Sequence, residues 1–238
     1  MLYLISLGLW DKLDISLRAI ETAKKCNRLY FEGYTNFYNS NIQELVDLFD
    51  KKIIYLDRED VENRSKHLVL IAKDQDIGLL VVGDALAATT HASLLIECRE
   101  NNVDYKIIHG SSILTAVAET GLSLYNFGRI ASLPFDHINI DTPIKVLQEN
   151  GDLHTLILLD LDVKNKKYMK IKEAIKYFLK YKIDRNCIVC CGLGSDRGLI
   201  KYGRILDFID FDVDIFPQCL IIPGKLHFIE LEFLAGFN

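Results

Sequence analysis

The run of residues 79–91 constrains the fold more than any other part of the sequence. Four apolar residues, 79–82, end abruptly at Gly83-Asp84, and small residues lead into a helical pattern that begins around Thr90. This is the pattern of a buried strand whose carboxyl end enters a loop that opens a helix. In α/β proteins, ligands bind outside the carboxyl ends of the strands. Asp84 therefore faces a binding crevice or, equally well on spacing alone, closes a turn or caps the helix.

Strand and helix patterns alternate along the first half of the chain. Strand patterns occupy residues 2–7, 28–32, 52–56, 77–82 and 105–108. Helical patterns occupy residues 15–25, 42–49, 58–72, 90–101 and 111–120. Asp14 and Asn41 stand where N-cap residues belong. Strands with little polar alternation, each followed by a helix, predict a mostly parallel sheet covered on both faces.

The strand–helix alternation restarts after residues 124–134, so we expect two α/β domains, residues 1–122 and 123–238. The second half shows strand patterns at 129–133, 154–159, 187–191 and 219–222, and helical patterns at 142–149, 170–181 and 227–235. The lysine-rich stretch 164–182 is typical of a solvated helix face, or else of a basic surface for a partner. The acidic run 207–214 predicts an exposed sheet edge.

The composition is that of a globular protein with material for a sizeable core. Half of the 238 residues are apolar and 26% are charged. A net charge of −5 gives no indication of general nucleic-acid binding. The apolar span 77–96 carries Asp84 and His91 near its middle, so we do not expect it to cross a membrane. No signal-peptide pattern is visible, and we expect a cytoplasmic protein.

The cysteines are expected to be reduced, buried thiols. The chain has six, and cytosolic proteins rarely form disulfides. Cys187, Cys190 and Cys191 invite a zinc interpretation, but they lie in a strand pattern, where alternate residues point to opposite faces. Because no second pair follows at metal-ligand spacing, we expect no metal site.

Several segments resemble, in order, the motifs of the tetrapyrrole-methylase superfamily and, within it, those of the diphthine synthase family. The loop 83–91 is similar to the Gly-Asp-Pro loop of the superfamily. The other segments are the N-terminal strand and loop 1–15, the loops 108–113 and 121–128, the strand 154–160 and the C-terminal segment 223–230. Any one of them is weak, but together they cover nearly the whole chain.

The resemblance implies two α/β domains of the tetrapyrrole-methylase type with a cofactor cleft between them. It further implies a homodimer that transfers methyl groups from S-adenosylmethionine, leaving S-adenosylhomocysteine, to the modified histidine of elongation factor 2 during diphthamide biosynthesis. Carried over position by position, the implied cofactor contacts are Leu9, Asp84, Ala87, Ser112, Ile113, Leu161, Leu193 and Gln218. Without the resemblance, Leu9, Ile113 and Leu161 would be interpreted as core residues.

The sequence identifies no catalytic residue. Methyl transfer from a sulfonium to a neutral amine mainly requires alignment of the reacting atoms, so no strong catalytic pair is needed. His91, at the start of the loop helix, is expected to be a structural hydrogen-bonding residue. His227 follows a Pro-Gly turn and is expected to cap the last helix.

The chain departs from the family pattern at several positions. Ala85 replaces the usual proline after Gly-Asp, Ser6 replaces a common glycine, and Gln218 stands where relatives often carry histidine. These departures put the rigidity of the loop in doubt, because proline would fix its φ angle. Two alternatives therefore stay open: a methylase of a small tetrapyrrole or corrinoid, and a degenerate protein that binds the cofactor without turnover.

An aromatic cluster follows the second predicted strand. Tyr34, Phe37 and Tyr38 lie in one loop, and aromatic residues are enriched at the cores of protein interfaces. We predict that this loop lies at or near the contact of a symmetric homodimer. Alternatively, the rings cover their own domain or the substrate cleft.

Overall fold

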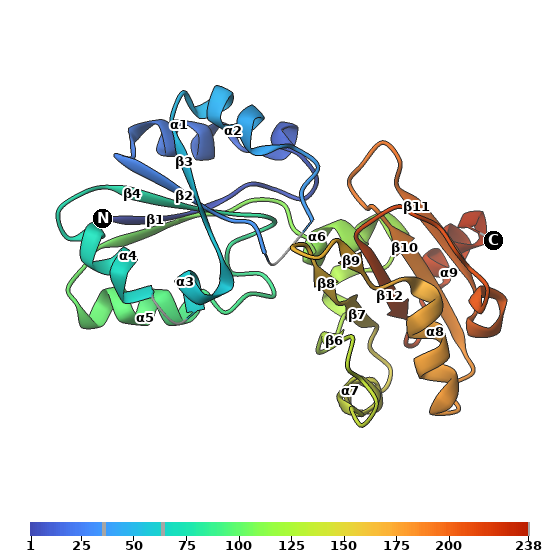
Figure 1. Cartoon of the computed structure of the whole chain (residues 1–238). Helices are drawn as coiled ribbons and strands as arrows, with labels where there is room; N and C mark the ends of the chain where they lie inside the picture. Colours follow the sequence, from blue (N-terminus) through green and yellow to red (C-terminus); the bar gives the residue numbers. More distant parts are fainter. Residues whose placement is uncertain (35–36, 63–64, 238) are drawn as a thin grey trace. The chain divides into compact units, whose positions relative to one another are not determined.

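The computed structural model describes residues 1–34, 37–62 and 65–237. The chain divides into two compact units, Met1–Leu114 and Thr115–Asn238. Each unit is a sheet with helices packed against it (Figure 1), which confirms the predicted α/β class. Within the described residues, no helix has both the length and the apolar character that a membrane span requires.

The first unit is built on a parallel sheet with the strand order β3-β2-β4-β1-β5. Its strands are β1 (Leu2–Ser6), β2 (Arg28–Glu32), β3 (Ile53–Leu56), β4 (Ile77–Val81) and β5 (Tyr105–Ile108). Each neighbouring pair runs parallel, as predicted. The carboxyl ends of β1, β4 and β5 therefore meet at one edge of the sheet.

Helices cover both faces of this sheet. They are α1 (Leu17–Lys25), α2 (Ile42–Phe49), α3 (Arg58–Glu62), α4 (Ser65–Ala72) and α5 (Ala92–Glu100). Figure 1 shows α1 and α2 on one face and α3, α4 and α5 on the other. Consecutive strand residues supply the two core layers, since Leu4 packs in one layer and Ile5 in the other. The helix predicted over 58–72 corresponds to α3 and α4, which lie on the two sides of residues 63–64, outside the described ranges.

The two predicted N-caps differ in outcome. Asn41 caps α2 in a capping box, because its side chain accepts from the backbone N–H of Glu44 and the Glu44 carboxylate accepts from that of Asn41. Asp14 does not cap α1: Ser16 does, with its hydroxyl oxygen accepting from Ala19 N at 3.1 Å. Asp14 is instead the last residue of the short helix η1 (Lys12–Asp14). Its carboxylate accepts a hydrogen bond from Trp10 N.

The second unit contains a mixed sheet with the strand order β11-β10-β12-β7-β6. Its strands are β6 (Ala131–Leu133), β7 (Thr155–Leu159), β10 (Asn186–Cys191), β11 (Leu199–Arg204) and β12 (Gln218–Ile222). β6 and β7 run parallel, whereas the other neighbouring pairs are antiparallel. Strand β11 was missed by the sequence analysis, because its residues are all partly exposed and do not form an apolar run. A short hairpin of β8 (Leu161–Asp162) and β9 (Lys167–Tyr168) follows β7.

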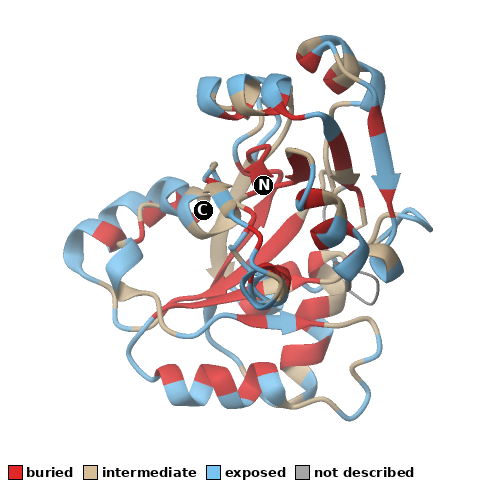
Figure 2. Cartoon of the chain, turned by 90° about the vertical axis from the view of Figure 1, so that its left-hand side faces the viewer, coloured by how far each residue is buried: buried red, intermediate tan, exposed pale blue. Residues whose placement is uncertain are grey.

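Helices of the second unit follow the predicted segments with shifted ends. They are α7 (Thr142–Asn150), α8 (Ile171–Lys180) and α9 (Phe228–Leu234). The helix predicted over 111–120 consists of α6 (Ile113–Ala116) and the 3-10 helix η2 (Val117–Thr120), which ends at Gly121 with φ +79°. Figure 2 shows buried stretches in the strands and helices that carry both buried and exposed residues; β4 is buried along its whole length, whereas β3 and β11 are partly exposed.

The lysine-rich stretch is a solvated helix face, as predicted. Ile171, Ile175 and Phe178 of α8 are fully buried, and its lysines lie on the other side of the helix. The acidic run is not the predicted sheet edge: residues 205–208 form the 3-10 helix η4, and residues 211–215 form no strand. Asp212 instead pairs with Lys170 and Lys172, both at 2.7 Å, so charge pairing rather than strand pairing orders this segment.

A buried polar cluster fixes α9 in the second unit. Glu230 is 2% exposed, and its carboxylate accepts from Ser123 N and His227 N, each at 2.8 Å. The Nε2 of the buried His154 lies 3.4 Å from Glu230, while His154 Nδ1 accepts from Gly224 N. Burial acts to raise the pKa of Glu230, but the hydrogen bonds outweigh it and lower that pKa to about 2.

We predict that Glu230 makes stability depend on pH in the acid range. Its pKa is lower in the folded chain than the ordinary 4.5, so its contribution is present above pH 4.5 and lost as the pH falls toward 2. Glu230→Gln should lower the free energy of unfolding at pH 7 by on the order of 3 kcal/mol and flatten its dependence below pH 4.5. Urea denaturation across this range measures both effects. Glu232→Gln, an exposed position on the same helix, is the control; equal effects of the two changes would contradict the prediction.

Candidate functional site

Two backbone hydrogen bonds join the turns that follow β1 and β4. Gly8 N donates to Gly83 O at 3.3 Å, and Gly83 N donates to Gly8 O at 2.7 Å. Both glycines have φ near +80°, a region that residues with a Cβ atom rarely adopt. A Cβ atom at Gly8 would also lie 2.4 Å from Asp14 Cβ. Glycine is therefore required here by both the backbone angle and the available space.

The end of β5 packs equally closely against this pair. A Cβ atom at Gly110 would lie 2.9 Å from Ser6 Cβ and 3.3 Å from Gly8 N. Three neighbouring strand ends thus meet with almost no side-chain volume between them. This leaves backbone close to the crevice side of the sheet, where α/β proteins bind ligands.

Asp84 connects the ends of β4 and β5. Its Oδ1 accepts from Leu86 N at 3.0 Å, which closes the local turn, and its Oδ2 contacts His109 Nδ1 at 2.8 Å and accepts from Gly110 N at 3.2 Å. The turn closure considered above is therefore present, whereas the helix cap is not, because the N-cap residue of α5 is His91. Partial burial acts to raise the pKa of Asp84, but the hydrogen bonds from Leu86, His109 and Gly110 lower it overall.

The departure at Ala85 is matched by the departure at Ser6. The backbone N–H of Ala85, which a proline would lack, donates to Ser6 Oγ at 2.9 Å. Both residues are buried, so this bond satisfies a donor that water does not reach. The carbonyl of Ala85 accepts from Thr89 Oγ1 at 2.7 Å and contacts His91 Nδ1 at 3.0 Å. The loop is therefore held by polar bonds at the position where the family uses a proline ring.

The other residues of the predicted cofactor set in this unit lie on the loops after β1, β4 and β5. Leu9 follows the Gly8 turn and is half-buried, so it is not a core residue. Ala87 N donates to Asp84 O, and Ser112 is buried just before α6, where its hydroxyl oxygen accepts from Leu114 N. Ile113 begins α6 and is partly exposed.

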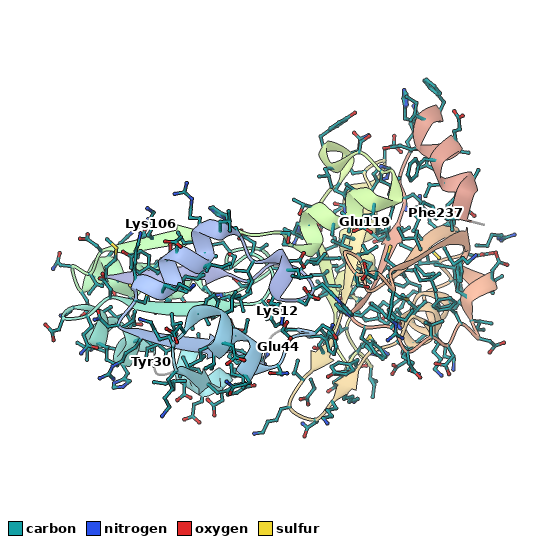
Figure 3. All side chains as sticks on the ribbon, turned by 90° about the horizontal axis from the view of Figure 1, so that it is seen from above. Lys12, Tyr30, Glu44, Lys106, Glu119 and Phe237 are labelled. Carbon is teal, nitrogen blue, oxygen red and sulfur yellow. The ribbon has the colours of Figure 1, made fainter. Side chains whose placement is uncertain are left out.

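The loop after β1 is attached to α2 by a charged pair. Lys12 Nζ lies 2.7 Å from the Glu44 carboxylate, and Figure 3 labels both side chains. Lys12 N also donates to Ser40 Oγ. These contacts fix the segment that follows Leu9 against its own unit.

The predicted residues of the second unit also gather at one edge of its sheet. β12 is antiparallel to both β7 and β10, so its start lies beside their carboxyl ends. Leu161 follows β7, Leu193 follows β10 and Gln218 begins β12. Leu193 and Gln218 are buried and Leu161 is partly exposed.

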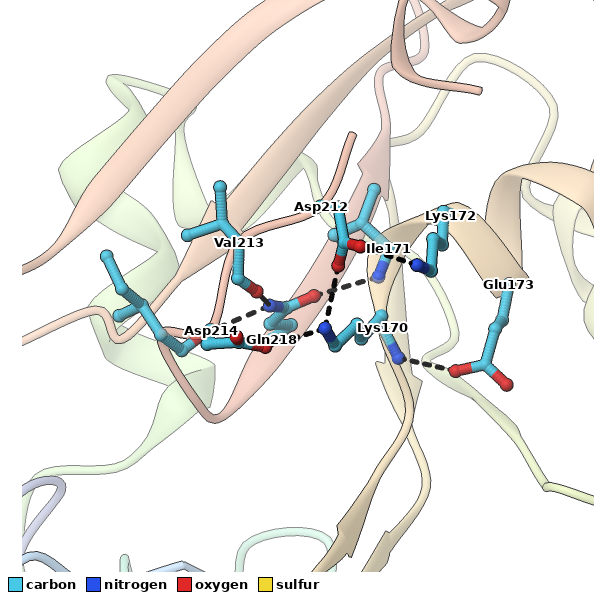
Figure 4. Close-up of polar contacts among 9 residues, drawn as sticks. Lys170, Ile171, Lys172, Glu173, Asp212, Val213, Asp214 and Gln218 are labelled. Atoms are coloured by element: carbon cyan, nitrogen blue, oxygen red, sulfur yellow. Dashed lines mark hydrogen bonds and ion pairs between the residues drawn. The ribbon is translucent and has the colours of Figure 1, made fainter. Parts of the chain in front are cut away.

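The Gln218 side chain is bonded within the second unit (Figure 4). Its Oε1 accepts from Ile171 N at 2.8 Å, and its Nε2 donates to Val213 O at 2.7 Å and Ile215 O at 3.1 Å. These bonds attach the start of α8 to the segment that carries the Asp212 ion pairs.

Two histidines have the structural roles expected from the sequence, and a third was missed. His91 is buried and hydrogen-bonded, and His227 caps α9 by accepting from Ile229 N. The sequence analysis gave His109 no role, although it follows β5 directly. Its side chain is 70% exposed, and its Nδ1 lies 2.8 Å from the Asp84 carboxylate.

The cysteines are buried thiols, as predicted. Burial raises the pKa of Cys187 and of Cys191, which keeps both thiols protonated and unreactive. Across the described residues, no cluster of three or more His, Cys, Asp or Glu side chains with the geometry of a metal site is present.

The fold is that of an α/β protein whose glycine-containing loops meet at the carboxyl ends of a parallel sheet, the edge at which proteins of this class bind ligands. Residues 1–205 match the family model of the tetrapyrrole (corrin/porphyrin) methylases. A diphthine synthase of Methanocaldococcus jannaschii is 38% identical over 98% of this chain and 97% of its own length. A diphthine methyl ester synthase of Schizosaccharomyces pombe is 35% identical over 100% of this chain and 94% of its own.

Solved structures agree with these relatives. A crystal structure of diphthine synthase superposes with a TM-score of 0.93 at 34% identity, covering 100% of this chain and 95% of that one. A putative diphthine synthase from Entamoeba histolytica superposes with a TM-score of 0.89 at 30% identity, covering 100% and 98%. The chain belongs to the tetrapyrrole methylase family and, within it, to the diphthine synthases. It is accordingly a methyltransferase.

We predict that Ser6 and Ala85 are energetically coupled. Ser6→Ala should lower the free energy of unfolding by about 1–3 kcal/mol, because it leaves the buried Ala85 N–H without an acceptor. Adding Ala85→Pro should recover part of that loss, since proline has no N–H. Urea denaturation of both single variants and the double variant measures the coupling. Ser111→Ala, an exposed serine, is the control; strictly additive effects at Ser6 and Ala85 would contradict the prediction.

Proposed function

We propose that this protein transfers methyl groups from S-adenosylmethionine to the modified histidine of elongation factor 2 in diphthamide biosynthesis. The observation that carries the proposal is the similarity, over nearly the full length of both chains, to proteins named diphthine synthase in archaea and to a diphthine methyl ester synthase in yeast. The edge of the first sheet is consistent with it, because glycines and small residues let a ligand approach the backbone there.

The residues at this edge offer a ligand mainly backbone groups and small or apolar side chains. Close packing of Gly8, Gly83 and Gly110 leaves backbone at the strand ends, and residues 85–88 of the following loop are small or apolar. We propose that the loops carrying Leu9, Asp84, Ala87, Ser112 and Ile113 hold the cofactor, together with Leu161, Leu193 and Gln218 from the second unit. Several of these contacts would be made by backbone N–H and C=O groups, which explains why apolar residues dominate the set.

The chemistry asks the protein mainly for alignment. When bound, S-adenosylmethionine supplies a methyl group on an activated sulfonium leaving group. The lone pair of the acceptor nitrogen forms the new N–C bond while the electrons of the C–S bond stay with sulfur. A rigid set of loops can contribute much of the rate by orientation, because holding reactants in line removes the entropic cost of meeting.

Asp84 has two roles in this proposal. It holds the ends of β4 and β5 together, and its lowered pKa keeps it a carboxylate at neutral pH. A carboxylate has about four acceptor positions, and the three contacts within the chain leave it able to accept one more hydrogen bond from a ligand. The neighbouring His109 side chain contacts this carboxylate and is mostly exposed, so it can move together with Asp84.

The reaction can be tested directly on the acceptor protein. We expect elongation factor 2 that carries the unmethylated modified histidine to gain methyl label when it is incubated with this protein and isotope-labelled S-adenosylmethionine. Mass spectrometry of the histidine peptide counts the groups added. Labelling of a tetrapyrrole or corrinoid, with none on elongation factor 2, would instead support the small-molecule methylase. Binding of S-adenosylhomocysteine without transfer to any acceptor would support the degenerate protein.

We predict that Asp84→Asn separates activity from stability. The amide cannot supply the negative charge, so methyl transfer should fall by about tenfold or more while the chain stays folded. Asp104→Asn, an exposed position before the amino end of β5, is the matched control and should change neither property. Full activity in Asp84→Asn with only a lower melting temperature would show that Asp84 merely closes the turn.

We further propose that the protein forms a homodimer through the surface of α9. Four large apolar residues of this helix, Phe228, Ile229, Leu231 and Phe233, are each more than half exposed. Tyr125 of the neighbouring 3-10 helix η3 (Leu124–Asn126) is 86% exposed, and the Glu230–Ser123 hydrogen bond holds η3 against α9. Exposed apolar patches of this kind are typical of protein interfaces, and two-fold pairing is the commonest arrangement of soluble oligomers.

The surface of α9 and the aromatic loop with Tyr34, Phe37 and Tyr38 are two different candidates for the dimer contact. The ring centroids of Phe37 and Trp10, both in the first unit, are 5.8 Å apart, and Phe37 is only partly exposed. This favours α9 over the aromatic loop as the dimer contact. We predict that Phe228→Asp or Leu231→Asp converts a dimer to a monomer, because each places a charge in an apolar contact. Light scattering over a concentration series measures the mass. Phe37→Asp should leave the dimer intact, and a monomeric wild-type chain at micromolar concentration would reject the proposal.

A further inference from the structure

We infer that the buried pair Glu32–His91 positions the Gly83–Ala88 loop for ligand binding. The side chains of Glu32 and His91 contact each other and the Ala85 carbonyl, and not a reacting atom. Both are therefore positioning residues rather than catalytic ones. The inference deepens the proposed function and rests on it for the identity of the ligand. It assigns a task to two ionisable groups that the proposed chemistry does not use.

His91 links two distant segments of the first unit. Its Nδ1 lies 3.0 Å from the carbonyl oxygen of Ala85, and its Nε2 lies 2.7 Å from a carboxylate oxygen of Glu32. A carbonyl can only accept, so Nδ1 must carry a proton. The 2.7 Å between Nε2 and the Glu32 carboxyl oxygen is within hydrogen-bonding distance. One imidazole ring thus connects the loop after β4 to the last residue of β2.

The pair is enclosed by the protein. The side chain of His91 is 2% exposed and that of Glu32 is 0% exposed. Glu32 ends β2 directly opposite Val81, the last residue of β4, so its carboxylate starts from a fixed place on the sheet. The link is therefore attached at one end to the rigid sheet and at the other to the loop.

The point where the link meets the loop is Ala85, next to Asp84. The N–H of Ala85 is already held by Ser6 Oγ at 2.9 Å, and its carbonyl by His91 and Thr89. Both polar groups of one residue are thereby fixed, the N–H by a residue of β1 and the carbonyl by residues just before α5. Because Asp84 is the preceding residue, a rotation of this backbone would move the carboxylate away from His109 and Gly110.

Stability alone gives weak reason for such a pair. Removing two charges from water is costly, and apolar residues of similar volume often serve equally well in a core. A buried imidazole with a donor directed at one carbonyl does what apolar packing cannot, since it specifies the direction of that carbonyl. This distinction can be measured, because a structural role and a positioning role predict different effects on ligand affinity.

The test compares Glu32→Gln, which keeps the shape and removes the charge, with His91→Phe, which keeps a ring and removes both contacts. Two observables are followed in folded protein: amide hydrogen exchange of the segment 83–90 without ligand, and the Kd for S-adenosylhomocysteine. Leu45→Ala is the destabilised control, in the core layer on the other face of the sheet. Thr90→Ala is the exposed neighbouring control.

We expect both pair variants to exchange faster over 83–90 and to raise the Kd at least about tenfold, since small misplacements at a site are costly. The double variant should be no worse than His91→Phe alone, because the two residues act as one unit. Leu45→Ala should lower global stability yet leave both observables unchanged. Unchanged exchange and Kd in the pair variants, or equal changes in Leu45→Ala, would overturn the inference. A wild-type chain that does not bind S-adenosylhomocysteine defeats the proposed function, while the exchange data still decide the inference.

Discussion

Parallel pairing of β1 between β4 and β5 is the constraint on which the rest of the first unit depends. Strands that run in one direction bring their carboxyl ends to one edge, so the loops after all three must share that space. Gly8 and Gly83 resolve the crowding by pairing backbone to backbone, and Gly110 packs against them. A ligand that binds there meets peptide groups whose positions are set by the sheet itself.

The loop after β4 shows how a departure from a family pattern can be compensated. Where a proline would restrict the backbone covalently, this chain restricts it with hydrogen bonds: the N–H of Ala85 donates to Ser6, and its carbonyl accepts from Thr89 and His91. The donor that Ala85 gains over proline is the one that Ser6 accepts. Each substitution taken separately puts the rigidity of the loop in doubt, but the hydrogen bond between the two residues restrains the loop.

The second unit positions its loops by different means. Its sheet is mainly antiparallel, and the start of β12 lies between the ends of β7 and β10. Gln218 at that start bonds to the beginning of α8 and to the segment 213–215 (Figure 4). The carried-over position therefore lies at the expected edge, yet its side chain supports the frame. For Gln218, similarity to the family therefore indicates where the residue lies in the fold, but not which of its atoms would contact a ligand.

The sequence by itself determined the elements of the first unit, the glycine turn at the end of β4 and the family, because strand periodicity, turn residues and motif order are local and leave a pattern along the chain. It did not determine the partly exposed strand β11 or the N-cap at Ser16, where local signals were weak or ambiguous. Tertiary structure alone decided the contacts that give the candidate site its shape. Ser6 meets Ala85, Asp84 meets His109 and Glu32 meets His91 across long stretches of sequence. Single polar contacts between distant residues produce no periodicity, so they become visible only when the sheet has brought its strand ends together.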